Sequence, residues 1–241
     1  MTRKRRTRDE TRDLLLSAAV RVVIARSSGD SHGSTNPLAG VRITDALDEV
    51  NLMLRLRDPN ATEMTTGAAY NIWPTQEDFQ QALLDAIMSA AAVPQIEQVR
   101  AELEQGIHDG NDWRELVARC FGTDFEVSFE EPTMFPMIAV ATLAAPQKIA
   151  AINEDGNHQY VMETGRILRA IFRHGGRRLA PGHTIDELVW AIEAIEVGYL
   201  IRRRTNPEVT SRKVRGRTAV QRAIVALVEQ FTVDAAAPTT G

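Results

Sequence analysis

The stretch MTTGAAYNIWPTQEDF, residues 64–79, decides how this chain is interpreted. A threonine hydroxyl can accept the free backbone N–H groups of a first helical turn, so Thr65 or Thr66 is expected to begin a helix. The small residues that follow leave this turn almost bare and able to approach another surface closely. Pro74 ends the predicted helix, and Thr75 begins the next one, with acidic residues in its first turn.

Tyr70 and Trp73 lie three residues apart in this stretch and are therefore expected to share one helix face. A short helix with a bare start and an aromatic rim suits insertion into the major groove of DNA. It equally suits a connector whose Tyr and Trp only pack on a neighbouring helix. The residues by themselves leave both interpretations open.

Helical periodicity dominates the chain on both sides of this stretch. Apolar residues recur every three or four positions in residues 9–27, as a one-sided helix requires. Residues 27–40 predict a loop, and Asp58-Pro59-Asn60 predicts a turn. Alternating strand patterns are missing, and EVSFEE (126–131) is interpreted as a helix end or loop. The sequence therefore predicts an all-α protein with further helices near 41–57, 76–92, 94–107, 111–127, 133–144, 146–174, 184–204 and 217–232.

Composition limits the class of protein. The chain has 241 residues, 44% hydrophobic and 25% charged, with a net charge of −4. This is typical of a globular protein with a substantial core, and it argues against a uniformly basic nucleic-acid coat while leaving a local basic patch open. No stretch is long and apolar enough to span a membrane, and the single Cys120 fits a reducing cytoplasm. We therefore expect a cytoplasmic protein without a membrane partner.

Several of these segments resemble one known protein family. TTGAAYNIWPTQEDFQQALL (65–84) resembles the second half of the helix-turn-helix in TetR-family transcriptional regulators. RDLLLSAAVRVV (12–23) and VRITDALDEV (41–50) resemble the first and second helices of that family. The resemblance covers about residues 9–92. It implies a DNA-binding domain at 1–90 and a helical domain for ligand binding and dimerisation at 91–241.

The chain departs from the family pattern in the turn. LMLRLRDPNATE (52–63) stands where the family has a turn of three or four residues, and the loop before the second helix is also longer. A helix-turn-helix depends on its turn to hold two helices at a fixed angle. Either the second helix is extended and the turn bulges at Asp58-Pro59-Asn60, or the site is remodelled. Gln76 replaces a lysine that usually meets a phosphate.

The resemblance implies a set of DNA-contacting residues. The resemblance implies that Tyr70 and Trp73 are held against backbone and core, while Arg42 and Thr44 at the start of the second helix meet phosphates. The residues of the recognition helix expected to face the groove are Thr65, Thr66, Ala68 and Asn71. The N-terminal stretch TRKRRTR (2–8) has five basic residues and is called the basic arm. It could follow the phosphates or the minor groove, or be a solvated tail. Asn71 could contact adenine in a bidentate manner. The predicted DNA-binding residues are Arg3, Lys4, Arg5, Arg6, Arg42, Thr44, Thr65, Thr66, Gly67, Ala68, Tyr70, Asn71 and Trp73.

Two apolar sets are assigned in the second half of the chain. Both can be plain core, and the resemblance favours an effector pocket and a homodimer interface. The predicted pocket residues are Trp113, Phe121, Phe125, Phe129, Met134, Phe135, Met137, Ile138 and Met162. The predicted dimer residues are Ile185, Leu188, Ile192, Ile195, Tyr199, Val220, Ile224, Leu227 and Phe231.

The enzyme class finds little support. Glu154 and His158 could share a metal on one helix face, but no third ligand is near in sequence, and no catalytic motif is recognised. We expect no metal and no cofactor.

The seven Lys and Arg in residues 202–217 indicate a solvated helix end and loop, or a further nucleic-acid or partner surface. The prediction is a homodimeric repressor that binds a palindromic operator and a small-molecule effector. The alternative is a helical ligand-binding or scaffolding protein that no longer reads DNA.

Overall fold

The structure is a computed structural model that describes residues 6–27, 40–90, 96–143 and 146–236. Within these residues the chain forms eleven helices and two three-residue strands. The all-α prediction is confirmed, and the predicted helices occur within a few residues of their expected bounds. EVSFEE lies at the end of a helix, as predicted.

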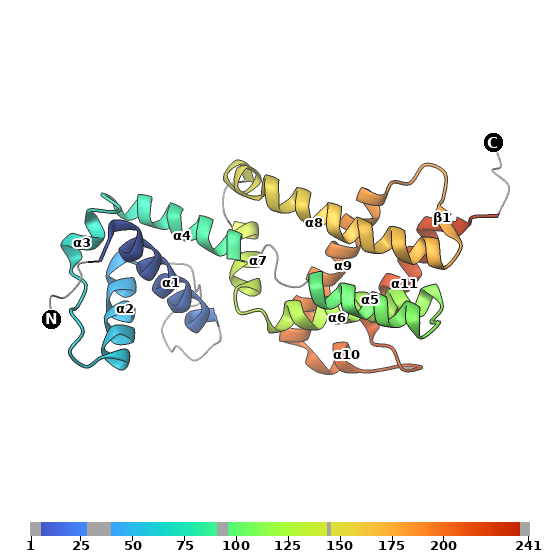
Figure 1. Cartoon of the computed structure of the whole chain (residues 1–241), viewed down its shortest axis with the longest axis horizontal. Helices are drawn as coiled ribbons and strands as arrows, with labels where there is room; N and C mark the ends of the chain where they lie inside the picture. The colour runs from blue at the N-terminus through green and yellow to red at the C-terminus, as the bar shows by residue number, and fades with distance from the viewer. Residues whose placement is uncertain (1–5, 28–39, 91–95, 144–145, 237–241) are drawn as a thin grey trace. The chain divides into compact units, whose positions relative to one another are not determined.

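The chain divides into two compact units. The first contains residues 1–91 and 132–153, and the second contains residues 92–131 and 154–241. The helices of the first unit are α1 (Arg8–Ser27), α2 (Ile43–Arg57), α3 (Thr66–Tyr70), α4 (Gln76–Ala90) and α7 (Met134–Leu143) (Figure 1).

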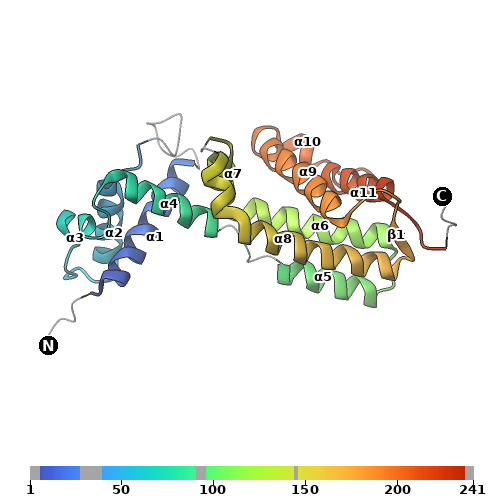
Figure 2. The same cartoon turned by 90° about the horizontal axis from the view of Figure 1, so that it is seen from above.

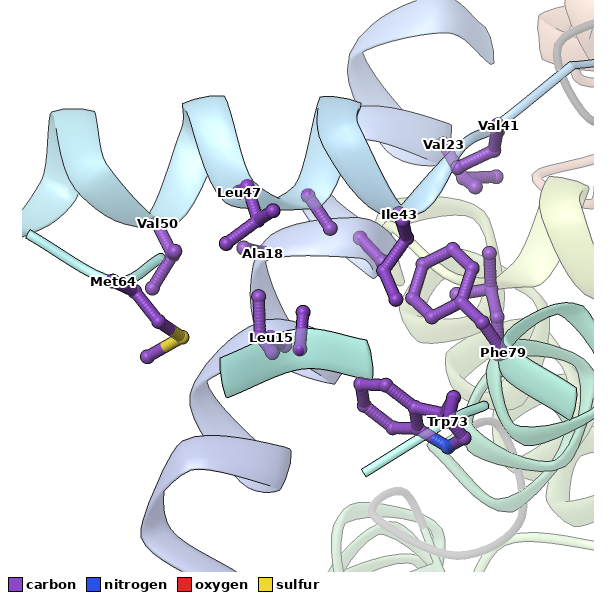
Figure 3. Close-up of a cluster of buried hydrophobic side chains, with 14 of the residues drawn as sticks. Leu15, Ala18, Val23, Val41, Ile43, Leu47, Val50, Met64, Trp73 and Phe79 are labelled. Atoms are coloured by element: carbon purple, nitrogen blue, oxygen red, sulfur yellow. The ribbon is translucent and has the colours of Figure 1, made fainter. Parts of the chain in front are cut away.

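The core of the first unit forms where the apolar stripe of α1 meets α2, α3 and α4. Leu15, Ala18, Ala19 and Val23 are fully buried, and their spacing of three and four residues puts them on one face of α1. Figure 3 shows this cluster, to which α2 and the segment around Trp73 also contribute. Because the alanines lack long side chains, the neighbouring helices can pack close to α1.

The second unit is a helical bundle. Its helices are α5 (Ile96–His108), α6 (Trp113–Glu130), α8 (Pro146–His174), α9 (Ile185–Thr205), α10 (Pro207–Ser211) and α11 (Ala219–Phe231), with the first residues of α8 belonging to the first unit. Helix α6 packs against α5, α9 and α11 (Figure 2). Gly106 allows the approach of α5 to α6, since a Cβ there would lie 2.5 Å from Cδ2 of Leu116.

The helices of this bundle begin where the sequence supplies caps. The side chains of Asp112, Thr184 and Thr218 accept hydrogen bonds from the backbone N–H three residues later, at the starts of α6, α9 and α11. Each cap satisfies a donor that the helix itself leaves free.

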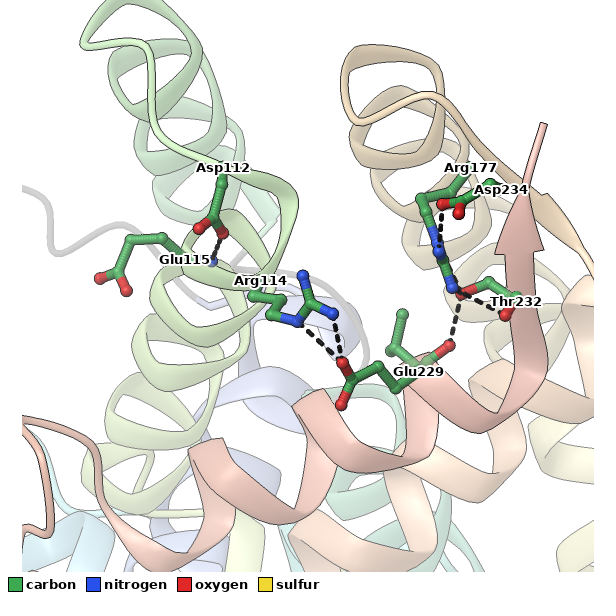
Figure 4. A network of polar contacts seen from close by, with 8 residues as sticks. Asp112, Arg114, Glu115, Arg177, Glu229, Thr232 and Asp234 are labelled. Carbon is green, nitrogen blue, oxygen red and sulfur yellow. Dashed lines mark hydrogen bonds and ion pairs between the residues drawn. The ribbon is translucent and has the colours of Figure 1, made fainter. Parts of the chain in front are cut away.

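Two short strands were not predicted from the sequence. β1 (Arg177–Leu179) pairs antiparallel with β2 (Thr232–Asp234), and a guanidinium fastens the pair (Figure 4). Arg177 donates to the carbonyl of Thr232 at 2.7 Å and to the carboxylate of Asp234 at 2.6 Å. Its guanidinium also lies 4.9 Å from the ring centre of Trp113. The strands are too short for an alternating pattern to reveal them.

In the described part of the chain, no helix combines the length and apolar character needed to cross a membrane.

Candidate nucleic-acid interface

Helix α3 begins and ends at local signals. The Thr65 hydroxyl accepts a hydrogen bond from the backbone N–H of Ala68 at 3.2 Å, which caps the first turn as predicted. The helix ends at Tyr70, before Pro74 is reached. Trp73 then turns inward and packs edge-to-face on Phe79, with ring centres 5.3 Å apart.

The expectation that Tyr70 and Trp73 share a face is wrong. Tyr70 is 43% exposed, whereas Trp73 is 5% exposed. The rule of three-residue spacing holds only inside a helix, and residues 71–73 lie beyond the end of α3. The two aromatics therefore have different roles: Trp73 anchors the segment, and Tyr70 remains at the surface.

The outer face of α3 is polar and small. Ala69 is buried against the core and Ala68 is half-buried, which fixes the inward side of the helix. Ala68 was expected to face the groove, but it packs on the core cluster instead. The three other residues expected in the groove, Thr65, Thr66 and Asn71, are exposed, and so are Gly67 and Tyr70. Hydroxyl, amide and phenol groups of this kind can contact base edges and phosphates, and the bare Gly67 lets backbone come close.

An asparagine holds the long connection between α2 and α3. Asn51 of α2 donates to the carbonyl of Met64 at 3.0 Å, and its own side-chain oxygen accepts from the N–H of Met64 at 2.7 Å. The Asn51 amide thus bonds both backbone groups of Met64, the residue before Thr65, and holds it against α2. Met64 itself is buried in the core. The longer turn therefore has a fixed exit.

The turn also has internal bonds at the predicted position. Asp58 accepts from the backbone N–H of Asn60 at 2.9 Å through its side chain and from that of Ala61 at 2.8 Å through its carbonyl. Arg55 pairs with Glu63 across the turn at 2.7 Å. Helix α2 extends to Arg57, and the turn follows at Asp58-Pro59-Asn60, as the first of the two sequence-based alternatives describes.

Gln76 has a structural contact that the sequence did not suggest. Its amide nitrogen donates to the carbonyl of Val41 at 2.9 Å, and its oxygen accepts from the N–H of Ile43 at 3.1 Å. The side chain thus links the start of α4 to the start of α2. Together, Asn51 and Gln76 fix α3 by its two flanking segments. Amide side chains can do this because each offers a donor and an acceptor.

The start of α2 exposes two predicted phosphate contacts. Arg42 and Thr44 are both exposed. The backbone N–H of Arg42 donates to Asp45 at 2.9 Å, and Asp45 also pairs with Arg26 of α1 at 3.0 Å. These bonds fix the helix start and leave the Arg42 guanidinium at the surface.

Only one residue of the predicted arm set can be located. Arg3, Lys4 and Arg5 lie outside the described residues, as does most of the predicted loop at 27–40. Arg6 donates to the carbonyl of Thr62 at 3.1 Å, so it contacts the turn before α3.

The predicted pocket residues are divided between the two units. Met134, Phe135, Met137 and Ile138 lie on α7 in the first unit, where Met137 packs on the core cluster. Trp113, Phe121 and Phe125 are buried on α6, Phe129 is half-buried at its end, and Met162 of α8 is 39% exposed. Arg203 lies over the ring of Phe129 at 4.1 Å.

The predicted dimer residues face mainly into their own chain. Leu188, Ile192, Val220 and Ile224 are buried in the bundle. The others are half-buried: Ile185, Ile195, Tyr199, Leu227 and Phe231. Exposed apolar residues of α9 were not among the predicted dimer residues; they include Trp190 at 39% and Ile201 at 44%. Their spacing is offset from the inner stripe, and this offset is the signal that could have identified them.

The two metal-ligand candidates lie on one exposed stretch of α8. Glu154 and His158 are exposed on α8, and the described residues contain no group of three or more His, Cys, Asp or Glu that could hold a metal ion. Burial raises the pKa of the Cys120 thiol to about 12, so at neutral pH it is a protonated core group. The basic run 202–217 contains the end of α9, the short α10 and exposed connections.

The comparisons with known proteins follow this geometry. No family model and no curated protein matches the sequence. Among solved structures, the chain is similar to a transcriptional regulator of the TetR family from Cytophaga hutchinsonii, with a TM-score of 0.54 and 14% identity. The match covers 96% of this chain and 100% of that one. The resemblance noted in the sequence thus extends through the fold of both units.

Proposed function

We propose that this chain, which has the fold of a TetR-family transcriptional regulator, binds double-stranded DNA through α3 and regulates transcription as a homodimer. The observation that carries the proposal is the exposed polar face of α3 on a helix fixed at both flanks. Asn51 holds the segment before it, and Gln76 ties the segment after it to α2. A recognition element needs this rigidity because base contacts are lost when the helix tilts.

The dimer is proposed to form through α9 and α11. Helix α9 carries an outer apolar face at spacings of four, three and four residues, formed by Trp190, Ala194, Val197 and Ile201. A second copy of the chain would cover this face. The predicted dimer residues would pack beneath it, within the chain's own bundle. Two copies related by a twofold axis would read a palindromic operator with half-sites about one DNA turn apart.

Effector control is part of the same proposal. A ligand bound among the helices of the second unit would favour one arrangement of the dimer over another and so change operator affinity. Repression with release by the ligand is the expected direction.

The proposal is tested by selection from genomic DNA. The purified chain is incubated with fragmented DNA from its source at near-physiological salt, and the retained fragments are sequenced. Enrichment of a shared palindrome supports the regulator. Retention without a shared motif that vanishes as salt rises contradicts specific readout and leaves only phosphate binding.

The variant Asn71→Ala gives a residue-level test. Asn71 is exposed at the end of α3, and we expect its loss to weaken binding to the selected palindrome by about tenfold or more, since a good bidentate base contact contributes about 1–3 kcal/mol. Fluorescence anisotropy with a labelled duplex measures the change. Asn157→Ala, at an exposed site of α8, is the matched control and should bind as the unmodified chain does. Equal affinity of both variants would remove Asn71 from the interface.

A further inference from the structure

Helix α9 carries a carboxylate in its core stripe. The inward positions recur every four residues and are occupied by Leu188, Ile192, Glu196 and Leu200. The three apolar members are 0–2% exposed, and Glu196 is 7% exposed. Glu196 therefore stands where the packing pattern calls for an apolar side chain.

The Glu196 carboxylate is incompletely satisfied. Its Oε1 atom is buried and has no hydrogen-bond partner within the described part of the chain. An unpaired buried polar atom destabilises a fold, and an unpaired buried charge does so far more strongly. Packing therefore does not explain why a carboxyl group occupies this position.

The groups acting on Glu196 have the same charge. Burial raises its pKa well above the usual range, and Asp124 of α6 and Glu193 of α9 raise it further. Burial likewise raises the pKa of Asp124 to about 6. Burial and the same three carboxyl groups raise the pKa of Tyr160 on α8, which a contact with Thr164 opposes. Helices α6 and α9 thus bring three carboxyl groups to one region of the second unit, next to the Tyr160 phenol of α8.

Aromatic and apolar groups border this region. Tyr160 and Trp190 have ring centres 6.2 Å apart, and Asp124 stands between the buried Phe121 and the buried Phe125 on α6. Aromatic faces attract cations, and apolar surface accepts the body of an organic ligand. Two of the predicted pocket residues, Phe121 and Phe125, are therefore close to Asp124 along α6.

We propose that Glu196, with Asp124 and Glu193, binds an organic cation, a protonated amine carried on an apolar or aromatic body. The proposal rests on the effector control described above and specifies the chemical class of that effector. The ammonium group would donate to the unpaired Oε1 atom and offset the repulsion among the three carboxylates. Tyr160 and Thr164 belong to α8, a helix whose residues fall in both units, so a ligand here would also act on that helix.

A simple amine and its matched alcohol test the proposal on the full chain without DNA. The probes are 4-phenylbutylamine and 4-phenylbutan-1-ol, which share one apolar body and differ in charge. Isothermal titration calorimetry at pH 8 should give an affinity for the amine at least about tenfold above that for the alcohol. Glu196→Gln should reduce the affinity for the amine by at least about tenfold and leave the affinity for the alcohol unchanged. The exposed Glu104→Gln removes the same charge elsewhere in the unit and should change neither value.

The pH dependence adds a second readout. The amine is charged throughout the range, but the carboxyl groups bind protons in the free protein, so amine affinity should rise between pH 5 and pH 8. Asp124→Asn, which removes the group with a pKa of about 6, should flatten this rise.

Several results would overturn the proposal. One is equal binding of amine and alcohol, or of the unmodified chain and Glu196→Gln. Another is a Glu196-dependent signal from CaCl2 or MgCl2 as strong as that from the amine, since that would indicate a metal site. Amine binding in a chain that selects no DNA motif would support the cation site and contradict the regulator, so the two failures are distinguishable.

Discussion

At the scale of single residues, two amides define the DNA-binding candidate. Asn51 forms two hydrogen bonds with the backbone of Met64, just before α3. Gln76 forms two with the backbone at the start of α2. Sequence resemblance marked Gln76 as a lost phosphate contact, and it left Asn51 unnoticed. The structure gives both a positional role: Asn51 holds Met64, just before α3, and Gln76 joins the start of α4 to the start of α2.

Asn51→Ala should therefore destabilise the first unit. Two hydrogen bonds to Met64 are lost, and its backbone groups are left without those partners, at a cost of about 1–3 kcal/mol. The free energy of unfolding is measured by urea denaturation followed by circular dichroism. Asn157→Ala on α8 is the control and should stay within about 0.5 kcal/mol. Equal midpoints for Asn51→Ala and the unmodified chain would show that the turn does not need this residue.

At the scale of an element, α9 has an inner and an outer apolar face. Its inner stripe packs in the bundle, while Trp190 and Ile201 remain 39% and 44% exposed. A helix that is apolar on both sides is typical of an element buried on both sides. One side is covered within the chain, and the outer side is the face proposed to bind a second copy.

Ile201→Glu should shift the proposed dimer towards monomer. A carboxylate on the twofold interface would be brought near its own copy, and burial without a partner is strongly unfavourable. Sedimentation velocity measures the distribution of species. Val209→Glu introduces the same charge at a 61% exposed site of α10 and should leave the dimer intact. An undisturbed dimer in Ile201→Glu would exclude this face of α9 from the interface.

At the scale of the whole molecule, the acidic region links folding to pH. The folded state raises the pKa of Asp124 from 3.8 to about 6. A carboxyl with a raised folded pKa contributes stability below its unfolded pKa, and this contribution is lost as pH rises through the folded pKa. The pKa values of Glu196 and Glu193 are also raised by burial. Glu187 shifts in the opposite direction because it accepts bonds at the start of α9.

The free energy of unfolding of the unmodified chain should therefore fall relative to Asp124→Asn as pH rises from about 4 to above 6. One pKa unit corresponds to about 1.4 kcal/mol, so the difference for this group is on the order of 2–3 kcal/mol. Urea denaturation of both chains at several pH values measures it, and the variant cancels contributions from other groups. A constant difference across this range would show that Asp124 does not titrate with folding.

The sequence by itself determined the local features of this protein. Apolar spacing predicted the long helices, and Thr65 predicted the start of α3, because caps and helix faces depend on residues three or four apart. The family resemblance at residues 65–84 led to a fold that the solved-structure comparison bears out across 96% of the chain.

Only the tertiary structure decided which distant groups meet. Trp73 turns inward because α3 ends at Tyr70, Asn51 reaches Met64 across the turn, and Arg177 meets Asp234 through strands far apart in the chain. The position of Glu196 near Asp124 likewise depends on the packing of α9 against α6. The physical reason is that spacing along the chain fixes neighbours within a helix, whereas packing fixes neighbours between helices.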